Sequence, residues 1–112
     1  MDVVITDVSG VTKVELNGRL DTANVNQVET SFIAGIVPKG QNTMIDLTQV
    51  TFIASLGIRM LLSAARVLTR RGAKFVMYGA TPAVLDIIET TALSEVIPVL
   101  GTEADAMAAI NA

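Results

Sequence analysis

The chain has 112 residues, enough for one compact domain and too few for two ordinary ones, so we expect a single domain over residues 1–112. It contains no cysteine and no histidine, which excludes disulfides, a thiolate nucleophile, a Cys/His metal cluster and an imidazole base. We therefore expect no enzymatic activity, no metal and no other cofactor, and the net charge of −3 argues against a nucleic-acid-binding protein.

Apolar residues make up 51% of the chain, yet its longest uncharged stretch runs only from Leu47 to Ile58. A membrane-spanning helix needs about 20 apolar residues, so we expect no membrane span. The first residues also lack the basic-then-apolar pattern of a secretory signal, which predicts a cytoplasmic protein.

The first half of the chain predicts two strands, a helix and a third strand. β-branched and apolar residues from Val3 to Val8, a turn at Ser9-Gly10 and alternation from Thr12 to Asn17 predict two strands joined by a tight turn. Apolar residues at helical spacing predict a helix over Thr22–Ile36, with Asp21 or Thr22 as its N-cap. A short strand is expected over Thr43–Leu47.

The second half predicts a regular alternation of helices and strands. We expect a helix over Ser55–Arg70, a strand over Lys74–Tyr78 with apolar residues on both faces, a helix from Thr81-Pro82 to about Glu89, a strand over Val96–Leu100, and a final helix after Thr102. This order predicts an α/β fold with a mixed, mostly parallel sheet of four to five strands and about four helices.

The Ser55–Arg70 helix has a predicted core stripe and a predicted outer surface. At about 100° per residue, one broad face collects Ile58, Leu61, Leu62, Ala65 and Leu68, and a polar stripe beside it collects Arg59, Ser63, Arg66 and Arg70. Met60 and Val67 lie roughly 180–200° from Ile58, so we expect both to be exposed. This surface is either a protein-docking strip or an ordinary solvated helix with two isolated apolar residues.

Charge is distributed unevenly along the chain. Five of the eight basic residues lie between positions 59 and 74, whereas Phe75 to Ala112 contains five acids and no base. The asymmetry indicates a local basic face.

The segment from Asp46 to Gly57 connects a strand to this helix, which is where binding and switching chemistry gathers in open α/β folds. Ser55 falls at the start of the helix. Its hydroxyl either caps the helix or is presented to another protein. Asp21 and Asp46 follow strands or lie within them; they could lie near Ser55, or serve only as a helix cap and a turn-stabilising carboxylate.

Three sequence segments together resemble the STAS family, named for sulphate transporters and anti-sigma-factor antagonists. They are Leu16-Asn17-Gly18-Arg19-Leu20-Asp21, Ile45-Asp46-Leu47 through Phe52-Ile53-Ala54-Ser55-Leu56-Gly57-Ile58, and Gly72-Ala73-Lys74-Phe75-Val76. The resemblance covers nearly the whole chain and implies the STAS fold.

The resemblance further implies an anti-sigma-factor antagonist switched by phosphorylation. By position the phosphate acceptor is Ser55, its partners are a serine kinase that doubles as anti-sigma factor and a serine phosphatase, and the Asp21 loop lies beside the acceptor. We expect the partner to contact Asp21, Ala54, Ser55, Leu56, Gly57, Arg59, Met60, Ser63, Arg66 and Val67.

Two positions depart from the pattern of the regulatory members. Ala54 stands where they usually carry Asp, and Leu56 where they usually carry a small or hydroxylated residue. These departures favour the alternative of a non-phosphorylated accessory or scaffold subunit in a lipid-transport or stress-signalling assembly. A second alternative is a small-ligand-binding module with a cleft between the Asp21 loop and Ser55. Catalysis is disfavoured because Asp21, Asp46 and Ser55 offer no evident base.

Overall fold

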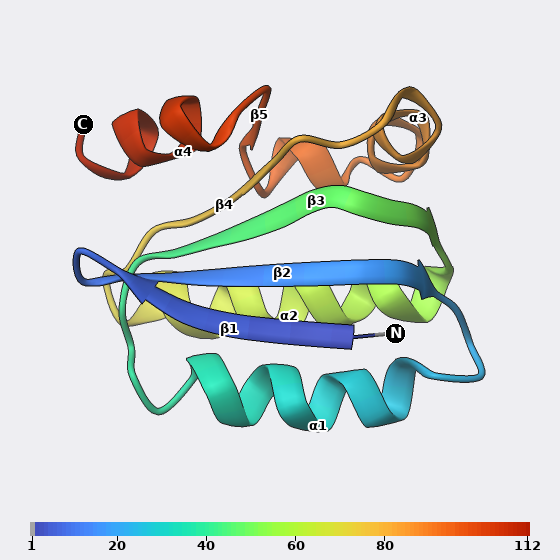
Figure 1. Ribbon diagram of the computed structural model, residues 1–112, viewed down its shortest axis with the longest axis horizontal. Helices are drawn as coiled ribbons and strands as arrows, with labels where there is room; N and C mark the ends of the chain where they lie inside the picture. The colour runs from blue at the N-terminus through green and yellow to red at the C-terminus, as the bar shows by residue number, and fades with distance from the viewer. Residues whose placement is uncertain (1) are drawn as a thin grey trace.

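A computed structural model describes residues 2–112 of the chain. Figure 1 shows a central sheet with helices on either side. In chain order the elements are β1 (Asp2–Val8), β2 (Val11–Leu20), α1 (Val25–Ile36), β3 (Thr43–Ile53), α2 (Ser55–Arg70), β4 (Phe75–Tyr78), α3 (Pro82–Thr90), the 3-10 helix η1 (Leu93–Glu95), β5 (Val99–Leu100) and α4 (Glu103–Ile110).

The five strands of this part of the chain form one sheet in the order β1-β2-β3-β4-β5. β1 and β2 are antiparallel, and the other neighbouring pairs are parallel. Ser9 and Gly10 connect the hairpin with φ angles of 53° and 82°, as expected for a two-residue turn whose twist matches that of the strands. The predicted mixed, mostly parallel α/β fold is therefore confirmed.

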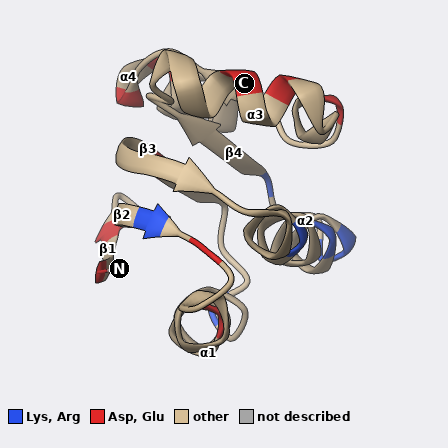
Figure 2. Ribbon diagram, turned by 90° about the vertical axis from the view of Figure 1, so that its right-hand side faces the viewer, with Lys and Arg blue, Asp and Glu red and all other residues tan. Residues whose placement is uncertain are grey.

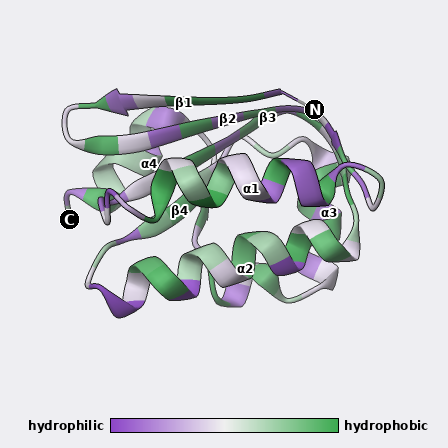
Figure 3. Ribbon diagram, turned by 90° about the horizontal axis from the view of Figure 1, so that it is seen from below, coloured by the Kyte–Doolittle hydropathy of each residue, from purple (hydrophilic) through white to green (hydrophobic). Residues whose placement is uncertain are grey.

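Alternating side chains divide the sheet into two packed faces. Val14, Ile45 and Met77 point into a large apolar cluster with α1 and α2, which lie side by side in Figure 3. Met44 and Val76 point the other way, into a smaller cluster that contains Ala106 and Ile110 of α4. All four residues of β4 are buried, as predicted for a strand covered on both faces. No helix within residues 2–112 is long and apolar enough to cross a membrane.

Helix α1 begins at Val25, three residues later than predicted. Asn24 is its N-cap residue, but the Asn24 side chain makes no cap hydrogen bond, because its amide donates to the Arg19 carbonyl at 2.7 Å and its amide oxygen accepts from the Asp21 N–H at 3.0 Å. Residues 22–24 consequently form a turn ahead of the helix. The turn is closed by Asp21, whose carboxylate accepts from the N–H groups of Ala23 and Asn24.

Strand β3 is longer than predicted, since it continues from Leu47 to Ile53. The pairing with β2 shifts register twice in this stretch, which interrupts the alternation of buried and exposed side chains. The sequence pattern typical of a strand is therefore absent after Leu47. At the first shift the Asp46 carboxylate accepts from the N–H and the hydroxyl of Thr48, at 2.8 and 2.6 Å. Asp46 therefore stabilises an irregularity within β3, whereas the sequence had suggested a carboxylate that stabilises a turn.

The C-terminal third contains one more correction. β5 comprises only Val99 and Leu100, because the turn that follows η1 occupies the first part of the predicted strand, where Val96 is 52% exposed. The helix starts agree with the sequence, since Thr81 accepts from the N–H of Val84 at 3.4 Å and Thr102 accepts from the N–H of Asp105 at 3.1 Å.

Candidate functional site

The end of the β2–β3 ladder brings two distant segments together. The pairing continues to Leu20 opposite Ile53, and the Ala54 N–H then donates to the Leu20 carbonyl at 2.8 Å. The loop that starts at Asp21 therefore leaves the sheet next to the point where the chain enters α2. The structure thus brings the Asp21 loop close to the start of α2, as the sequence resemblance implied.

Gly57 allows the first turn of α2 to approach this end of the sheet. A Cβ atom at Gly57 would lie 2.7 Å from both Cγ and Cδ2 of Leu20 and 3.0 Å from Cγ2 of Ile53. These contacts are closer than side chains normally tolerate, so glycine is needed here for packing. Gly57 is buried and supports the site from beneath.

Ser55 is the first residue of α2 and lies on the surface. Its suggested role as N-cap is wrong, because Ala54 occupies the N-cap position with extended backbone angles and has no side chain able to cap. Within residues 2–112 the Ser55 hydroxyl makes no hydrogen bond to another group of the protein. The oxygen is therefore free to meet a partner molecule.

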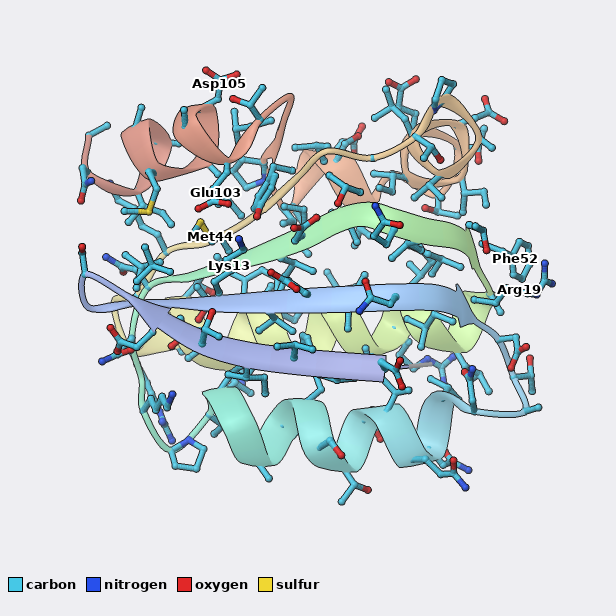
Figure 4. All side chains as sticks on the ribbon, in the orientation of Figure 1. Lys13, Arg19, Met44, Phe52, Glu103 and Asp105 are labelled. Carbon is cyan, nitrogen blue, oxygen red and sulfur yellow. The ribbon has the colours of Figure 1, made fainter. Side chains whose placement is uncertain are left out.

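A stacked pair that sequence reasoning missed lies at the same end of the sheet. The guanidinium of Arg19 sits over the ring of Phe52, 4.6 Å from its centroid, and Figure 4 shows the two side chains together beside the end of β2. The ladder places Arg19 opposite Phe52, after the second register shift. The two residues are 33 positions apart, and the sequence alone did not indicate their contact, because it depends on the register of β2 and β3. Arg19 Nε also lies 4.0 Å from the Asp21 carboxylate.

The orientation of α2 differs from the prediction. Met60 is fully buried, and the buried residues of the helix are Gly57, Met60, Leu61, Ala64, Ala65 and Leu68. Ile58 and Leu62, predicted to lie in the core stripe, are only partly buried at its edge. The helix packs against both the sheet and α1, which centres its buried face near Leu61 and Leu68. Met60 thus faces the protein interior and is excluded from the predicted docking strip.

The surface of α2 retains most of the other predicted residues. Leu56 is 40% exposed, Arg59, Ser63 and Arg66 are exposed, and Val67 is half-buried, so its expected exposure is also wrong. Ser55 and Arg59 are four residues apart and therefore share a face of the helix. The candidate surface runs from the Asp21 loop across Ser55 and Leu56 and along the arginine side of α2.

Asp46 lies away from this surface. The β3–β4 register places it opposite Tyr78, on the side of the sheet that α4 covers. There Glu103 of α4 accepts hydrogen bonds from Lys13 at 2.7 Å and from the Tyr78 hydroxyl at 3.2 Å, and Figure 4 shows Lys13 and Glu103 close together. Burial, together with the charges of Asp46 and Glu103, raises the pKa of Tyr78, and the hydrogen bond to Glu103 raises the pKa of Lys13. These groups attach α4 to the sheet.

Two hollows of the surface do not include Ser55 in their lining. One lies between the start of β1 and α1 and is lined by residues that include Asp2, Asn24 and Gln27. The other, mostly apolar, is lined by residues that include Phe75, Val96 and Pro98. Within residues 2–112, no three acidic side chains gather in a way that could hold a metal ion.

Comparison with known proteins gives consistent matches over most of the chain. The STAS domain family matches residues 2–106. BtrV of Bordetella bronchiseptica, whose name assigns it provisionally to the anti-sigma factor antagonists, is 25% identical over 111 residues, 99% of this chain and 96% of BtrV. An anti-sigma-B factor antagonist of Listeria monocytogenes is 26% identical over 88 residues, 79% of this chain and 77% of the relative.

Solved structures agree with these matches. The crystal structure of an anti-sigma factor antagonist from Mycobacterium paratuberculosis superposes with a TM-score of 0.90 and 26% sequence identity, over 99% of this chain and 94% of that one. Its similarity therefore extends to the whole arrangement of sheet and helices, including the junction between β3 and α2.

Proposed function

Because the chain belongs to the STAS domain family, we propose that it acts as an anti-sigma factor antagonist, a protein that binds an anti-sigma factor and thereby regulates sigma-factor-dependent transcription. Relatives that share most of its length carry this name. In the proposal the chain is a single cytoplasmic domain without enzymatic activity, and its partner is a serine kinase that also serves as the anti-sigma factor.

The exposed hydroxyl of Ser55 is the observation that carries this proposal. It lies at the start of α2, beside the Asp21 loop, without an internal hydrogen bond. The kinase would transfer the γ-phosphoryl group of ATP to Oγ of Ser55, with release of ADP and passage of the hydroxyl proton to a base of the kinase. A serine phosphatase would then hydrolyse the ester with water, restoring the hydroxyl and releasing inorganic phosphate.

Phosphorylation at this position would block docking without unfolding the protein. A phosphoserine adds about −1.5 to −2 charges and three acceptor oxygens to the candidate surface. The start of a helix favours an anion by about 0.3–1 kcal/mol, because free N–H groups and the helix dipole point toward it. The contacts that we assign to the partner are the surface groups of Asp21, Ala54, Ser55, Leu56, Arg59, Ser63 and Arg66, which Gly57 supports from below.

A second candidate function is favoured by Ala54 and Leu56. A kinase that recognises an acidic residue before the acceptor serine and a small residue after it would meet Ala54 and Leu56 at these positions instead. The chain would then be a non-phosphorylated accessory subunit that docks through the same surface, and Ser55→Ala would leave its function intact.

The experiment that separates these functions is intact-mass analysis of the protein recovered from its own cells, together with Ser55→Ala. We expect a fraction of the native protein to carry the mass of one phosphoryl group and the Ser55→Ala protein to carry none. Ser63→Ala is the matched control, because Ser63 is also an exposed serine of α2 and its loss should leave the modification unchanged.

Binding is measured on the same variants by affinity purification from these cells. The unmodified chain and Ser55→Ala should both retain an ATP-binding serine kinase, and Ser55→Glu should lose it. Absence of the phosphoryl group under all growth conditions would overturn the assignment of Ser55 and leave the accessory-subunit function. Persistence of the phosphoryl group in Ser55→Ala would overturn the assignment of Ser55 and place the modification on another residue.

A further inference from the structure

Three arginines form a line along the exposed face of α2. Arg59, Arg66 and Arg70, here called the arginine stripe, are all exposed and are separated by seven and four residues. Seven and four residues are close to whole numbers of helical turns, so the three side chains leave the same face of the helix. At 1.5 Å per residue, the stripe extends about 16 Å from the turn that follows Ser55 to the end of the helix.

The arginine stripe has no acidic partner within residues 2–112. The ion pairs of this part of the chain involve only Lys13 and Arg19 as bases, and no Asp or Glu occurs between Asp46 and Asp86. Arg66 and Arg70 lie four residues apart, where like charges repel and weaken the helix. The structure therefore maintains an unneutralised row of guanidinium groups.

This row is exceptional on an otherwise acidic protein. The chain has a net charge of −3, and α3, η1 and α4 carry five acids without a base. Figure 2 shows basic residues along α2, and acidic residues but no basic ones on α3 and α4. A polyanion such as DNA would be repelled by the rest of the molecule. The apolar side of α2 is buried in the core, so the helix cannot insert that side into a membrane.

We propose that the arginine stripe binds a carboxylate-bearing helix on the surface of a protein partner. The guanidinium group of arginine pairs with a carboxylate through two parallel hydrogen bonds. Complementary charges on two proteins also accelerate their association. Carboxylates spaced like the stripe would meet all three arginines at once.

The inference rests on the proposed function where it concerns regulation. A phosphate on Ser55 would lie four residues before Arg59 on the same face, the favourable order for an acid and a base on a helix. It would engage Arg59 and repel the carboxylates of the partner. The phosphate would thereby neutralise the charge of Arg59 and place a negative charge opposite the carboxylates of the partner.

The test uses the full chain, labelled with ¹⁵N, and a synthetic helical peptide as the probe. The peptide carries glutamates at the spacing of the stripe, and a control peptide carries glutamines at the same positions. We expect the glutamate peptide alone to shift the Nε–Hε signals of Arg59, Arg66 and Arg70, with an affinity that falls as salt is added. Arg66→Gln and Arg70→Gln should each weaken binding by about two- to fivefold, the range of exposed ion pairs.

Lys39→Gln is the matched control, since it removes an exposed positive charge beyond the end of α1 and should leave binding unchanged. Equal responses to the two peptides, or no loss in Arg66→Gln and Arg70→Gln, would overturn the proposal. A stronger response of the same arginine signals to a single-stranded oligonucleotide or to phosphatidylglycerol vesicles, at equal probe charge, would also overturn it.

The regulatory step is tested with phosphoserine incorporated genetically at position 55. We expect weaker binding of the glutamate peptide and a shift of the Arg59 signal, and unchanged binding would overturn the role of the stripe in the switch. Neither arm requires a kinase. If the phosphoserine did not weaken peptide binding, the proposal that Ser55 is phosphorylated would still stand. If Ser55 proved unphosphorylated in cells, the binding of the glutamate peptide to the arginine stripe would still stand.

Discussion

Residues at the start of α2 divide into those that hold the helix on the sheet and those that face the solvent. Gly57 and Met60 are buried against the core, whereas Ser55 and Leu56 are exposed beside the Asp21 loop. Because the two sets alternate within six residues, substitutions there can separate the stability of the fold from the binding of a partner.

Gly57→Ala is expected to destabilise the protein. The added methyl group would lie 2.7 Å from Leu20, and overpacking of this kind costs about 1–3 kcal/mol, which exceeds the gain of up to about 1 kcal/mol from the better helix propensity of alanine. The free energy of unfolding is measured by urea denaturation. Gly101→Ala is the control, because its nearest heavy atom would be a carboxylate oxygen of Asp105 at an ordinary 3.7 Å. Equal stability of Gly57→Ala and the native protein would contradict the tight packing.

Leu56→Asp should weaken partner binding and leave the fold intact. Leu56 is 40% exposed in the first turn of α2, where a carboxylate is favourable to the helix. Met60→Asp should instead unfold the protein, since it would place an unpaired charge in the core. Circular dichroism and co-purification of the partner distinguish the two effects. Val96→Asp, which changes another exposed apolar residue, should retain both fold and binding, and a folded Met60→Asp would contradict the orientation of α2.

Among the elements, α4 is attached to the sheet by a small apolar cluster and by polar contacts of Glu103. Only Ala106 and Ile110 of this short helix are buried, and Glu103 joins its first turn to Lys13 and Tyr78. The sequence indicated the helix and its Thr102 cap. It could not indicate the contact of Glu103 with Lys13, because the two residues are 90 positions apart and meet only once the sheet has formed.

This attachment predicts a loss of stability in alkali. Lys13 and Tyr78 both have raised pKa values in the folded protein, so each holds its proton more tightly when folded than when unfolded. Their contribution is fully present below about pH 10 and declines as the pH rises above it. We expect the free energy of unfolding to fall as the pH rises above about 10, and Tyr78→Phe to show a smaller fall than the native protein. An identical pH dependence in the variant would contradict this role of Tyr78.

At the scale of the molecule, the sheet joins two packed faces of unequal size. The larger cluster unites α1, α2, α3 and η1, and the smaller one unites β4 with α4. Met44 and Ile45 are adjacent in β3 and point into different clusters, so disruption of the strand would affect both faces. We therefore expect the two faces to unfold together.

The only tyrosine of the chain provides a test of this cooperativity. Tyr78 lies in the smaller cluster, and the chain has no tryptophan, so intrinsic fluorescence reports mainly on the α4 face. Far-ultraviolet circular dichroism reports on the helices of both faces. We expect the two signals to give the same denaturation midpoint, as for a single domain. An earlier fluorescence transition would show that α4 detaches before the rest of the protein unfolds.

Local sequence patterns determined most of the elements of this protein. Apolar spacing predicted α2 over its full observed length, and the cap residues Thr81 and Thr102 marked the starts of two helices. The position of Ser55 at the junction of strand and helix was also readable from sequence. These features depend on backbone geometry and hydrogen bonds within a few residues, which a short stretch of sequence specifies.

Tertiary contacts decided the extent of β3, the orientation of α2 and the neighbours of Ser55. Whether Met60 or Arg59 faces the core depends on how α2 contacts the sheet and α1 together, because helical spacing gives a relative angle and no absolute direction. The Asp21 loop reaches the start of α2 because β3 continues to Ile53 through two shifts of register. Such shifts arise from pairing with another strand, so only the assembled sheet determines them.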